Sequence, residues 1–267
     1  MNANWLNGAF ACYLAALMTY AAAYMFARPP WRRAGHALLS AAWVAQTVFL
    51  ILRWHASGHA PLANQFESLA SMSWGVTTLS FCFWRFTAGQ WLGPVTCALG
   101  LACLGLCALL DSTEAPLVPA LRSNWLLLHV SVIMLAYAAL ALSFLASAVY
   151  LGAYRRRESH ETARSLDRFN ERAMALGYVL LTAGIVLGAV WANEAWGSYW
   201  SWDPKETWSL ITWLVYTAAV HLRRTHRWQG RRMAGFSICG FAFVLFTYFG
   251  VNYLMSSLHS YAGSGMR

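Results

Sequence analysis

Long runs of apolar residues alternate with short polar segments along the whole chain. A run of about 20 apolar residues is long enough to cross a bilayer as a helix, and such runs recur eight times. We expect spans over residues 4–27, 36–54, 66–84, 91–110, 124–153, 173–192, 208–224 and 233–254. The pattern predicts an all-α integral membrane protein, a bundle of about eight transmembrane helices that forms a single polytopic membrane domain over residues 1–267.

The composition supports this class and excludes several others. Of the 267 residues, 59% are hydrophobic and 11% are charged, against roughly 45–50% and about 25% in a soluble domain. These values exclude a soluble enzyme, a disordered tail and a disulfide scaffold. The six cysteines all fall within predicted spans and form no Cys-x-x-Cys pair, so we interpret them as small packing residues.

The net charge of +9 would suggest nucleic acid as a partner in a soluble protein. Here the links between odd-numbered and even-numbered spans hold 15 of the 19 basic residues. One of these links, residues 155–172, mixes arginines with acidic residues and is expected to form a solvated surface helix. Basic links favour the cytoplasmic side, which predicts that both termini lie outside and removes the case for nucleic acid.

Tryptophan is concentrated in one outer loop, which we expect over residues 193–207. Six of the fifteen tryptophans lie between Trp191 and Trp213, around the charged sequence Asp203-Pro-Lys205-Glu206. Tryptophan favours membrane interfaces, which would explain one or two of these rings as an aromatic belt. Rigid, half-polar rings at this density also suit a large planar ligand, such as a porphyrin, a quinone or a lipid headgroup. Composition leaves both interpretations open.

Three histidines are candidate metal ligands because of their positions relative to the predicted membrane spans. His129 lies near the outer end of the fifth predicted span, and His259 lies just beyond the eighth. Each has a simpler interpretation: His129 as a helix-packing residue and His259 as a solvated residue of the tail. His221 follows Trp208 by thirteen residues, so it lies about 20 Å deeper in a helix. It is either a functional group within the membrane or an interfacial histidine.

Residues 196–213 closely resemble the tryptophan-rich WWD signature of the haem-handling proteins of cytochrome c biogenesis. The form of the signature is similar to that of the CcsA (ResC) branch of System II. Residues 57–68, 125–131 and 250–261 also resemble this family. The resemblance therefore runs from about residue 55 to residue 262, and the family also has eight spans.

The resemblance implies that haem b is both substrate and bound ligand, and that the site faces the periplasm from the bacterial cytoplasmic membrane. It implies outer iron ligands at His129 and His259, and a haem within the membrane at His221, with the opposing ligand on a CcsB/ResB-like membrane partner. The expected ring and polar contacts are Trp196, Trp200, Trp202, Asp203, Lys205 and Trp208. Lys205 is the only lysine and has three candidate partners: a haem propionate, Glu206 or a lipid phosphate.

The implied reaction is attachment of haem to the Cys-x-x-Cys-His segment of apocytochrome c, which makes the chain part of a haem-attaching enzyme without a certain catalytic residue. The main alternative is a membrane scaffold or exporter that passes haem to a separate ligase. A dihaem electron-transfer subunit and a quinone or lipid transporter are further alternatives. The spacing of His55 and His59 is weak evidence for a metal site, and their roles stay open.

Overall fold

The computed structural model describes residues 2–84, 90–113, 117, 121–155 and 160–256. Within these ranges the chain forms helices joined by turns, with no strand. It divides into two compact units, Met1–Pro116 and Leu117–Arg267. The single membrane domain expected over 1–267 stays a prediction, and each unit is described by itself.

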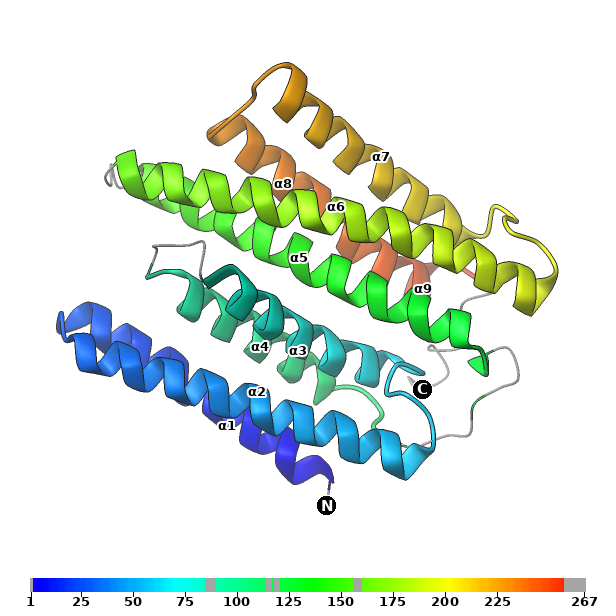
Figure 1. Cartoon of the computed structure of the whole chain (residues 1–267), viewed down its shortest axis with the longest axis horizontal. Coiled ribbons are helices and arrows are strands. Elements are labelled where there is room, and N and C mark those ends of the chain that lie inside the picture. The colour runs from blue at the N-terminus through cyan, green and yellow to red at the C-terminus, as the bar shows by residue number, and fades with distance from the viewer. Residues whose placement is uncertain (1, 85–89, 114–116, 118–120, 156–159, 257–267) are drawn as a thin grey trace. The chain divides into compact units, whose positions relative to one another are not determined.

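The first unit contains the helices α1 (Asn2–Met25), α2 (Pro29–Ser57), α3 (Gln65–Trp84) and α4 (Leu92–Cys107) (Figure 1). Contacts between α1 and α2, α2 and α3, α3 and α4, and α4 and α1 close the four helices into a bundle. In its centre the Tyr13 hydroxyl donates to Gln46 Oε1 at 2.6 Å and lies 2.5 Å from Thr77 Oγ1. Polar groups away from water need such partners, and these hydrogen bonds join α1, α2 and α3.

A buried ion pair fastens one end of this unit. Arg53 and Glu67 are only 4% and 1% exposed, and Arg53 Nε lies 2.9 Å from Glu67 Oε1. The guanidinium also donates to the carbonyl oxygens of Ser112 and Thr113, beyond α4. Removing one partner of such a pair leaves a buried charge, at a cost of about 3–5 kcal/mol. The pair therefore holds α2, α3 and the chain after α4 together.

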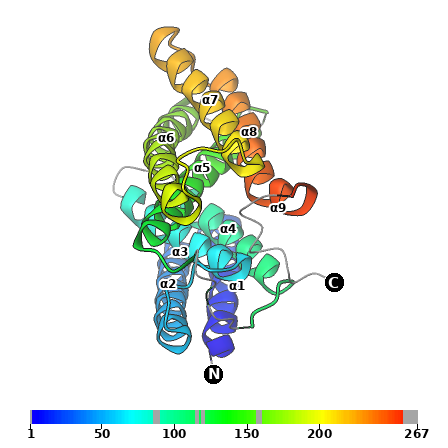
Figure 2. The ribbon, with the colours of Figure 1, turned by 90° about the vertical axis from the view of Figure 1, so that its right-hand side faces the viewer.

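The second unit contains the helices α5 (Asn124–Arg155), α6 (His160–Trp196), α7 (Pro204–Thr225) and α8 (Arg231–Leu245). A π-helical segment, η2 (Phe246–Gly250), continues α8 into the short helix α9 (Val251–Leu254). Helices α5 and α6 run side by side in Figure 1. Helix α7 contacts α6 and α8, on the side of these helices away from α5 (Figure 2).

Small side chains allow α5 and α6 to approach closely, as is common between helices in membranes. Ala136, Ala139 and Ala141 on α5 are fully buried. A Cβ added to Gly177 of α6 would lie 2.5 Å from Leu140 Cδ2. The Ser143 hydroxyl donates to Asn170 Oδ1 at 2.5 Å and lies 2.8 Å from Ser237 Oγ, which links α5, α6 and α8.

All eight predicted spans fall on helices. Among the residues that the structure describes, five helices are long and apolar enough to cross a membrane: Asn4–Met25, Pro29–Ser57, Asn124–Ala153, His160–Trp196 and Arg231–Leu254. The chain is therefore a multi-pass membrane protein. A crossing by α3, α4 or α7, and the side on which each terminus lies, stay predictions.

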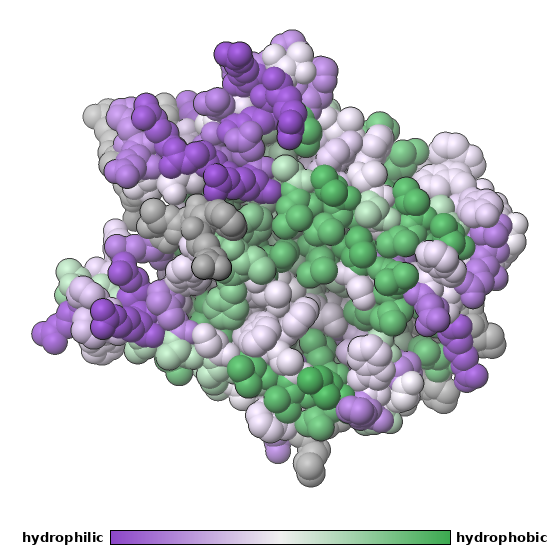
Figure 3. Space-filling model, viewed as in Figure 1, coloured by the Kyte–Doolittle hydropathy of each residue, from purple (hydrophilic) through white to green (hydrophobic). Residues whose placement is uncertain are grey.

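The surface of α6 shows the pattern of a membrane helix. Its first part, residues 160–172, belongs to the predicted basic surface helix, and Arg164, Arg168 and Arg172 are exposed there. Farther along, Val179 and Val186 are 61% and 60% exposed. Figure 3 shows hydrophilic residues gathered where α6 begins and α7 ends, and hydrophobic residues over the middle of α6. A hydrocarbon environment would cover this apolar middle.

Candidate functional site

The tryptophan-rich loop is shorter than its predicted extent of 193–207. Helix α6 continues through Trp196, and α7 already begins at Pro204. Gly197 ends α6 with a φ of 76° while its N–H donates to the Asn193 carbonyl at 2.9 Å. Glycine adopts this left-handed conformation without steric cost. The loop proper is residues 197–203.

A capping box starts α7 and shapes the loop before it. The Asp203 side chain accepts a hydrogen bond from the Lys205 backbone N–H at 3.0 Å, and Asp203 is 7% exposed. Glu206 Oε2 accepts from the backbone N–H groups of Asp203 at 3.2 Å and Ser201 at 2.8 Å. These bonds satisfy donors at the helix start. The Asp203 carboxylate, predicted to contact the ligand, thus caps the helix.

Trp202 stands between the two amides that Glu206 binds. Its φ is 60°, a left-handed value that is unusual for a bulky residue and strains the backbone. The Trp202 carbonyl accepts from Thr207 Oγ1 at 3.2 Å, which adds a third restraint. Its side chain is 68% exposed. The loop therefore holds a large apolar ring outward at a cost in backbone strain, an arrangement common at ligand sites.

The tryptophan rings of this region lie in three places, on α6, on the loop and on α7. On α6 the rings of Trp191 and Trp196 lie 4.8 Å apart, and Trp191 is buried. On the loop the Trp200 and Trp202 rings lie 5.7 Å apart at 90°. On α7 the Trp208 ring lies 4.2 Å from that of Phe246 in η2. The predicted ring contacts thus come from three neighbouring elements of one unit.

His129 on α5 lies beside the tryptophan rings on α6. Its ring stacks on Trp191, with centroids 6.1 Å apart and planes within 12°. His129 Nδ1 lies 2.7 Å from the Gly184 carbonyl oxygen of α6. Because a carbonyl only accepts, Nδ1 carries the proton in the neutral ring and Nε2 carries the lone pair. Such a bond orients histidine ligands of metals.

Gly188 provides the space for the His129 ring. A Cβ at residue 188 would lie 2.6 Å from His129 Cε1 and 2.7 Å from Nδ1. Contacts this close cannot persist, so any larger residue would displace the imidazole from the Gly184 carbonyl. The position of His129 therefore depends on a glycine of the neighbouring helix.

Lys205 turns toward the end of the chain. Its Nζ donates to Asn252 Oδ1 of α9 at 2.9 Å. Lys205 precedes the predicted span 208–224, and burial lowers the pKa of its ammonium group to about 8, although the neighbouring Asp203 carboxylate opposes this shift. Loss of water around a cation disfavours its charged form and so lowers its pKa. The structure thus gives Lys205 an amide partner.

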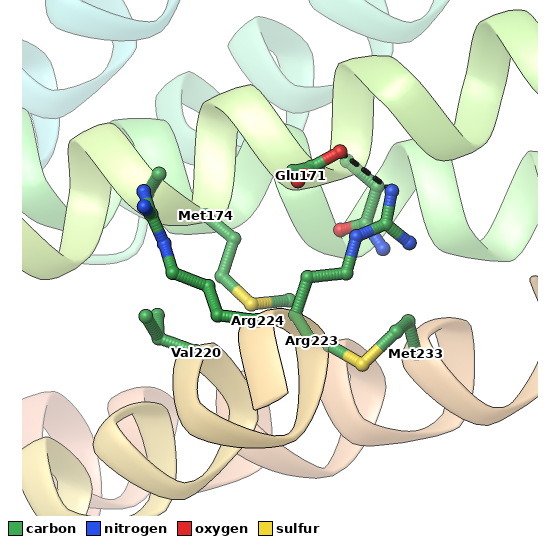
Figure 4. A pocket seen from close by; sticks show the side chains of 8 residues that line it. Glu171, Met174, Val220, Arg223, Arg224 and Met233 are labelled. Atoms are coloured by element: carbon green, nitrogen blue, oxygen red, sulfur yellow. Dashed lines mark hydrogen bonds and ion pairs between the residues drawn. The ribbon is translucent and has the colours of Figure 1, made fainter. Parts of the chain in front are cut away.

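His221 lies in the last turns of α7 and is exposed. Its ring lies 5.9 Å from the ring of His226, which is also exposed. A small pocket near this end of α7 has a volume of about 30 Å³, and its lining residues are Asn170, Glu171, Met174, Ala175, Val220, Arg223, Arg224 and Met233 (Figure 4). Arg223 Nη2 pairs there with Glu171 at 2.6 Å. The pocket has room for about one water, and His221 does not line it.

The remaining candidate histidines lie elsewhere. His259 is outside the described residues. In the first unit, His55 is exposed at the end of α2, and His59 Nδ1 lies 3.0 Å from the Ala60 carbonyl oxygen. These positions assign no function to His55 or His59.

Three features of the site were missed by the sequence interpretation. The Glu206 clamp, meaning the two hydrogen bonds from the Ser201 and Asp203 N–H groups to the Glu206 carboxylate, could have been predicted from the sequence. Asp203-Pro-Lys-Glu206 has the spacing of a capping box. Gly188 and Asn252 had no such signal, since their partners lie 59 and 47 residues away in the chain.

The apolar helices and their polar ends define a multi-pass helical membrane protein. Residues 62–259 match the family model described as cytochrome C assembly protein. The cytochrome c biogenesis protein CcsA of Synechococcus sp. (strain CC9605) is 41% identical over 253 residues, which cover 80% of this chain and 82% of that protein. CcsA of Synechocystis sp. (strain ATCC 27184 / PCC 6803 / Kazusa) is 37% identical over 96% of each chain. The chain belongs to the CcsA family of cytochrome c assembly proteins.

A solved structure named cytochrome c heme lyase CcmF has a similar fold, with a TM-score of 0.71 and 20% sequence identity. The match covers 97% of this chain and 47% of that chain, so this chain spans about half the length of that structure. At this identity the similarity shows the fold alone.

Proposed function

We propose that the chain brings haem to the outer face of the membrane and holds it there for covalent attachment to apocytochrome c. Membership of its family places the chain in cytochrome c biogenesis. In the proposal the macrocycle of haem b lies against Trp196, Trp200, Trp202 and Trp208. His129 and His259 bind the iron from opposite faces.

The observation that carries this proposal is the setting of His129. Its Nδ1 is engaged by the Gly184 carbonyl, and its ring stacks on Trp191, which contacts Trp196. A neutral imidazole with a defined tautomer and a fixed ring plane is what an axial iron ligand requires. The exposed, strained Trp202 supplies an apolar ring on the neighbouring loop. These residues therefore fit haem as a substrate.

The proposed reaction needs no oxidant. Each cysteine S–H of the Cys-x-x-Cys-His segment adds across one haem vinyl group, so that sulfur bonds to one vinyl carbon and the hydrogen goes to the other. The chain contributes orientation and proximity, and two imidazole ligands leave the iron no open position for oxygen. The histidine of the incoming segment then displaces one protein ligand, which helps to release the product.

His221 is proposed to bind haem near the inner surface, before the haem reaches the loop. Its exposure on α7 and the small size of the nearby pocket support a haem bound on the outside of this unit. A CcsB/ResB-like membrane partner would then supply the opposing ligand. The basic links support an orientation in the bacterial cytoplasmic membrane with the tryptophan-rich loop in the periplasm.

The test is the absorption spectrum of the purified full-length chain with haem. We expect a six-coordinate bis-imidazole spectrum that is lost in His129→Ala and in His259→Ala, and unchanged in His160→Ala, whose side chain is exposed at the start of α6. Unchanged spectra in the first two variants would overturn the outer site. If His221→Ala supports normal cytochrome c maturation, the inner site is wrong.

A second experiment separates attachment from delivery. The chain and its membrane partner are reconstituted with haem and an apocytochrome, and covalent haem is measured on a denaturing gel by its peroxidase stain. Covalent haem supports attachment by this complex. Bound haem without covalent product indicates a scaffold or exporter that serves a separate ligase.

A further inference from the structure

The π-helical segment η2 is docked on the start of α7. The Thr247 hydroxyl lies 2.9 Å from Thr212 Oγ1 and 3.3 Å from the Trp208 carbonyl oxygen. The Phe246 ring lies 4.2 Å from the Trp208 ring. This first contact holds η2 against the helix that follows the tryptophan-rich loop.

A second contact with α7 follows five residues later. Asn252 Oδ1 in α9 accepts the hydrogen bond from Lys205 Nζ at 2.9 Å. Lys205 belongs to the first turn of α7, next to the Asp203 cap. The chain after α8 thus contacts one neighbouring helix through both Thr247 and Asn252.

The π-helical geometry explains how both contacts are made. Residues of an α-helix turn by about 100° each, so residues five apart point about 140° away from one another. A π-helix closes i→i+5 hydrogen bonds, which bring residues five apart onto one face. In a regular α-helix, docking of Thr247 on α7 would turn Asn252 away from Lys205.

Gly250 allows this turn to close. A Cβ at residue 250 would lie 2.6 Å from Phe246 Cδ2, so a larger residue would push the Phe246 ring off Trp208. Single-turn π segments frequently mark functional sites. Here the segment directs the last described turn of the chain toward the tryptophan-rich loop.

We propose that Lys205 and Asn252 are positioning residues, whose hydrogen bond fixes the start of the C-terminal tail beside the tryptophan-rich loop. The tail that leaves α9 carries His259, so the inference rests on the proposed function for its effect on haem. Lys205 then acts through Asn252, and a haem propionate is not its partner. The two models make different predictions for Asn252.

The test uses the full-length chain with haem in four forms: wild type, Lys205→Met, Asn252→Leu and the double variant. Loss of a hydrogen bond from a charged group costs about tenfold or more in an equilibrium. We expect each single variant to lower the ratio of bis-imidazole to mono-imidazole haem by about tenfold, and the double variant to lower it no further. Added imidazole should restore the six-coordinate spectrum in all three.

Asn252→Asp is the conservative variant, because it retains an oxygen acceptor for Lys205. We expect it to keep the wild-type spectrum alone and to lose it when combined with Lys205→Met. Arg224→Met removes one exposed cation at the other end of α7 and should leave the haem spectrum unchanged. If Lys205→Met weakens haem binding while Asn252→Leu does not, Lys205 binds the haem directly and the inference is overturned. Additive losses would overturn it as well.

Amide hydrogen exchange over residues 251–254 gives a readout that does not depend on haem. We expect Lys205→Met and Asn252→Leu to accelerate this exchange equally, by about tenfold. A wild-type chain without a bis-imidazole spectrum would overturn the proposed function, whereas unchanged exchange in the variants would overturn the positioning role. The two failures are therefore distinguishable.

Discussion

Glu206 provides the sharpest test of how the loop displays Trp202. In Glu206→Ala the backbone N–H groups of Ser201 and Asp203 lose the carboxylate oxygen that accepts both, at 2.8 and 3.2 Å. Loss of these two hydrogen bonds releases Trp202, which lies between Ser201 and Asp203 in the chain. Glu206 has no role in haem contact in our proposal, so the variant tests loop geometry alone.

The size of the effect of Glu206→Ala follows from two opposing free energies, that of the hydrogen bonds to Glu206 and that of the backbone strain at Trp202. A hydrogen bond to a charged group contributes about 1.5–3 kcal/mol. Two such bonds in a partly solvent-exposed loop contribute about 3 kcal/mol in total. Holding a non-glycine residue in the left-handed region costs about 1–2 kcal/mol. The clamp therefore exceeds the strain at Trp202 while Glu206 is present, and the strain prevails once it is removed. Glu206→Gln keeps neutral hydrogen bonds of about 1 kcal/mol each, which roughly balance the strain.

Hydrogen–deuterium exchange of the peptide 197–208 measures the effect. We expect the Ser201 and Asp203 amides to exchange about 100-fold faster in Glu206→Ala, since about 1.4 kcal/mol corresponds to tenfold. Glu206→Gln should give an intermediate rate. Adding Trp202→Gly to Glu206→Ala should recover about tenfold of the protection, because glycine adopts the left-handed conformation without strain.

Two outcomes would refute this reasoning. If exchange in Glu206→Ala equals that of the wild type, the carboxylate does not hold the loop. If Trp202→Gly gives no recovery in the Glu206→Ala background, the backbone at residue 202 stores no strain, and the display of the ring needs another cause.

Two further predictions concern other parts of the site. Gly188→Ala should displace the His129 ring and abolish the bis-imidazole spectrum. Gly152→Ala on α5, where an added Cβ would meet nothing within 4 Å, should leave the spectrum unchanged. Equal spectra for the two variants would contradict the packing argument. Burial lowers the pKa of Lys205 to about 8, so the folded state releases its proton more readily than the unfolded chain. Stability should therefore rise as the pH increases through about 8 toward the unfolded value, and denaturant titrations in detergent should show this rise disappearing in Lys205→Met.

The helices could be predicted from the apolar runs, but several of their ends could not. Helix α2 begins at Pro29, seven residues before the predicted span, because proline is favourable in the first turn of a helix. Helix α6 begins at His160, thirteen residues before its predicted span. Buried Leu166 and Phe169 show that this basic segment packs against the unit on one face, so the helix continues past the apolar run.

The candidate site was predictable in residue type and only partly in arrangement. The spacing of Asp203 and Glu206 signals a helix cap, and the density of tryptophan marks the loop. The π turn had no such signal, because Phe-Thr-Tyr-Phe-Gly reads as one more apolar stretch of helix. It forms where Thr247 and Asn252 both meet α7.

The sequence by itself determined the class of protein, the presence of a helix at each of the eight apolar runs, and the family. These properties depend on the hydropathy of whole segments and on a long motif, both of which are written in consecutive residues. The tertiary structure decided which atoms are engaged and which rings are displayed. The partner of His129 is a carbonyl 55 residues away in the chain, and the partner of Lys205 is an amide 47 residues away. Such contacts arise only when helices pack, because packing brings distant residues within hydrogen-bonding distance.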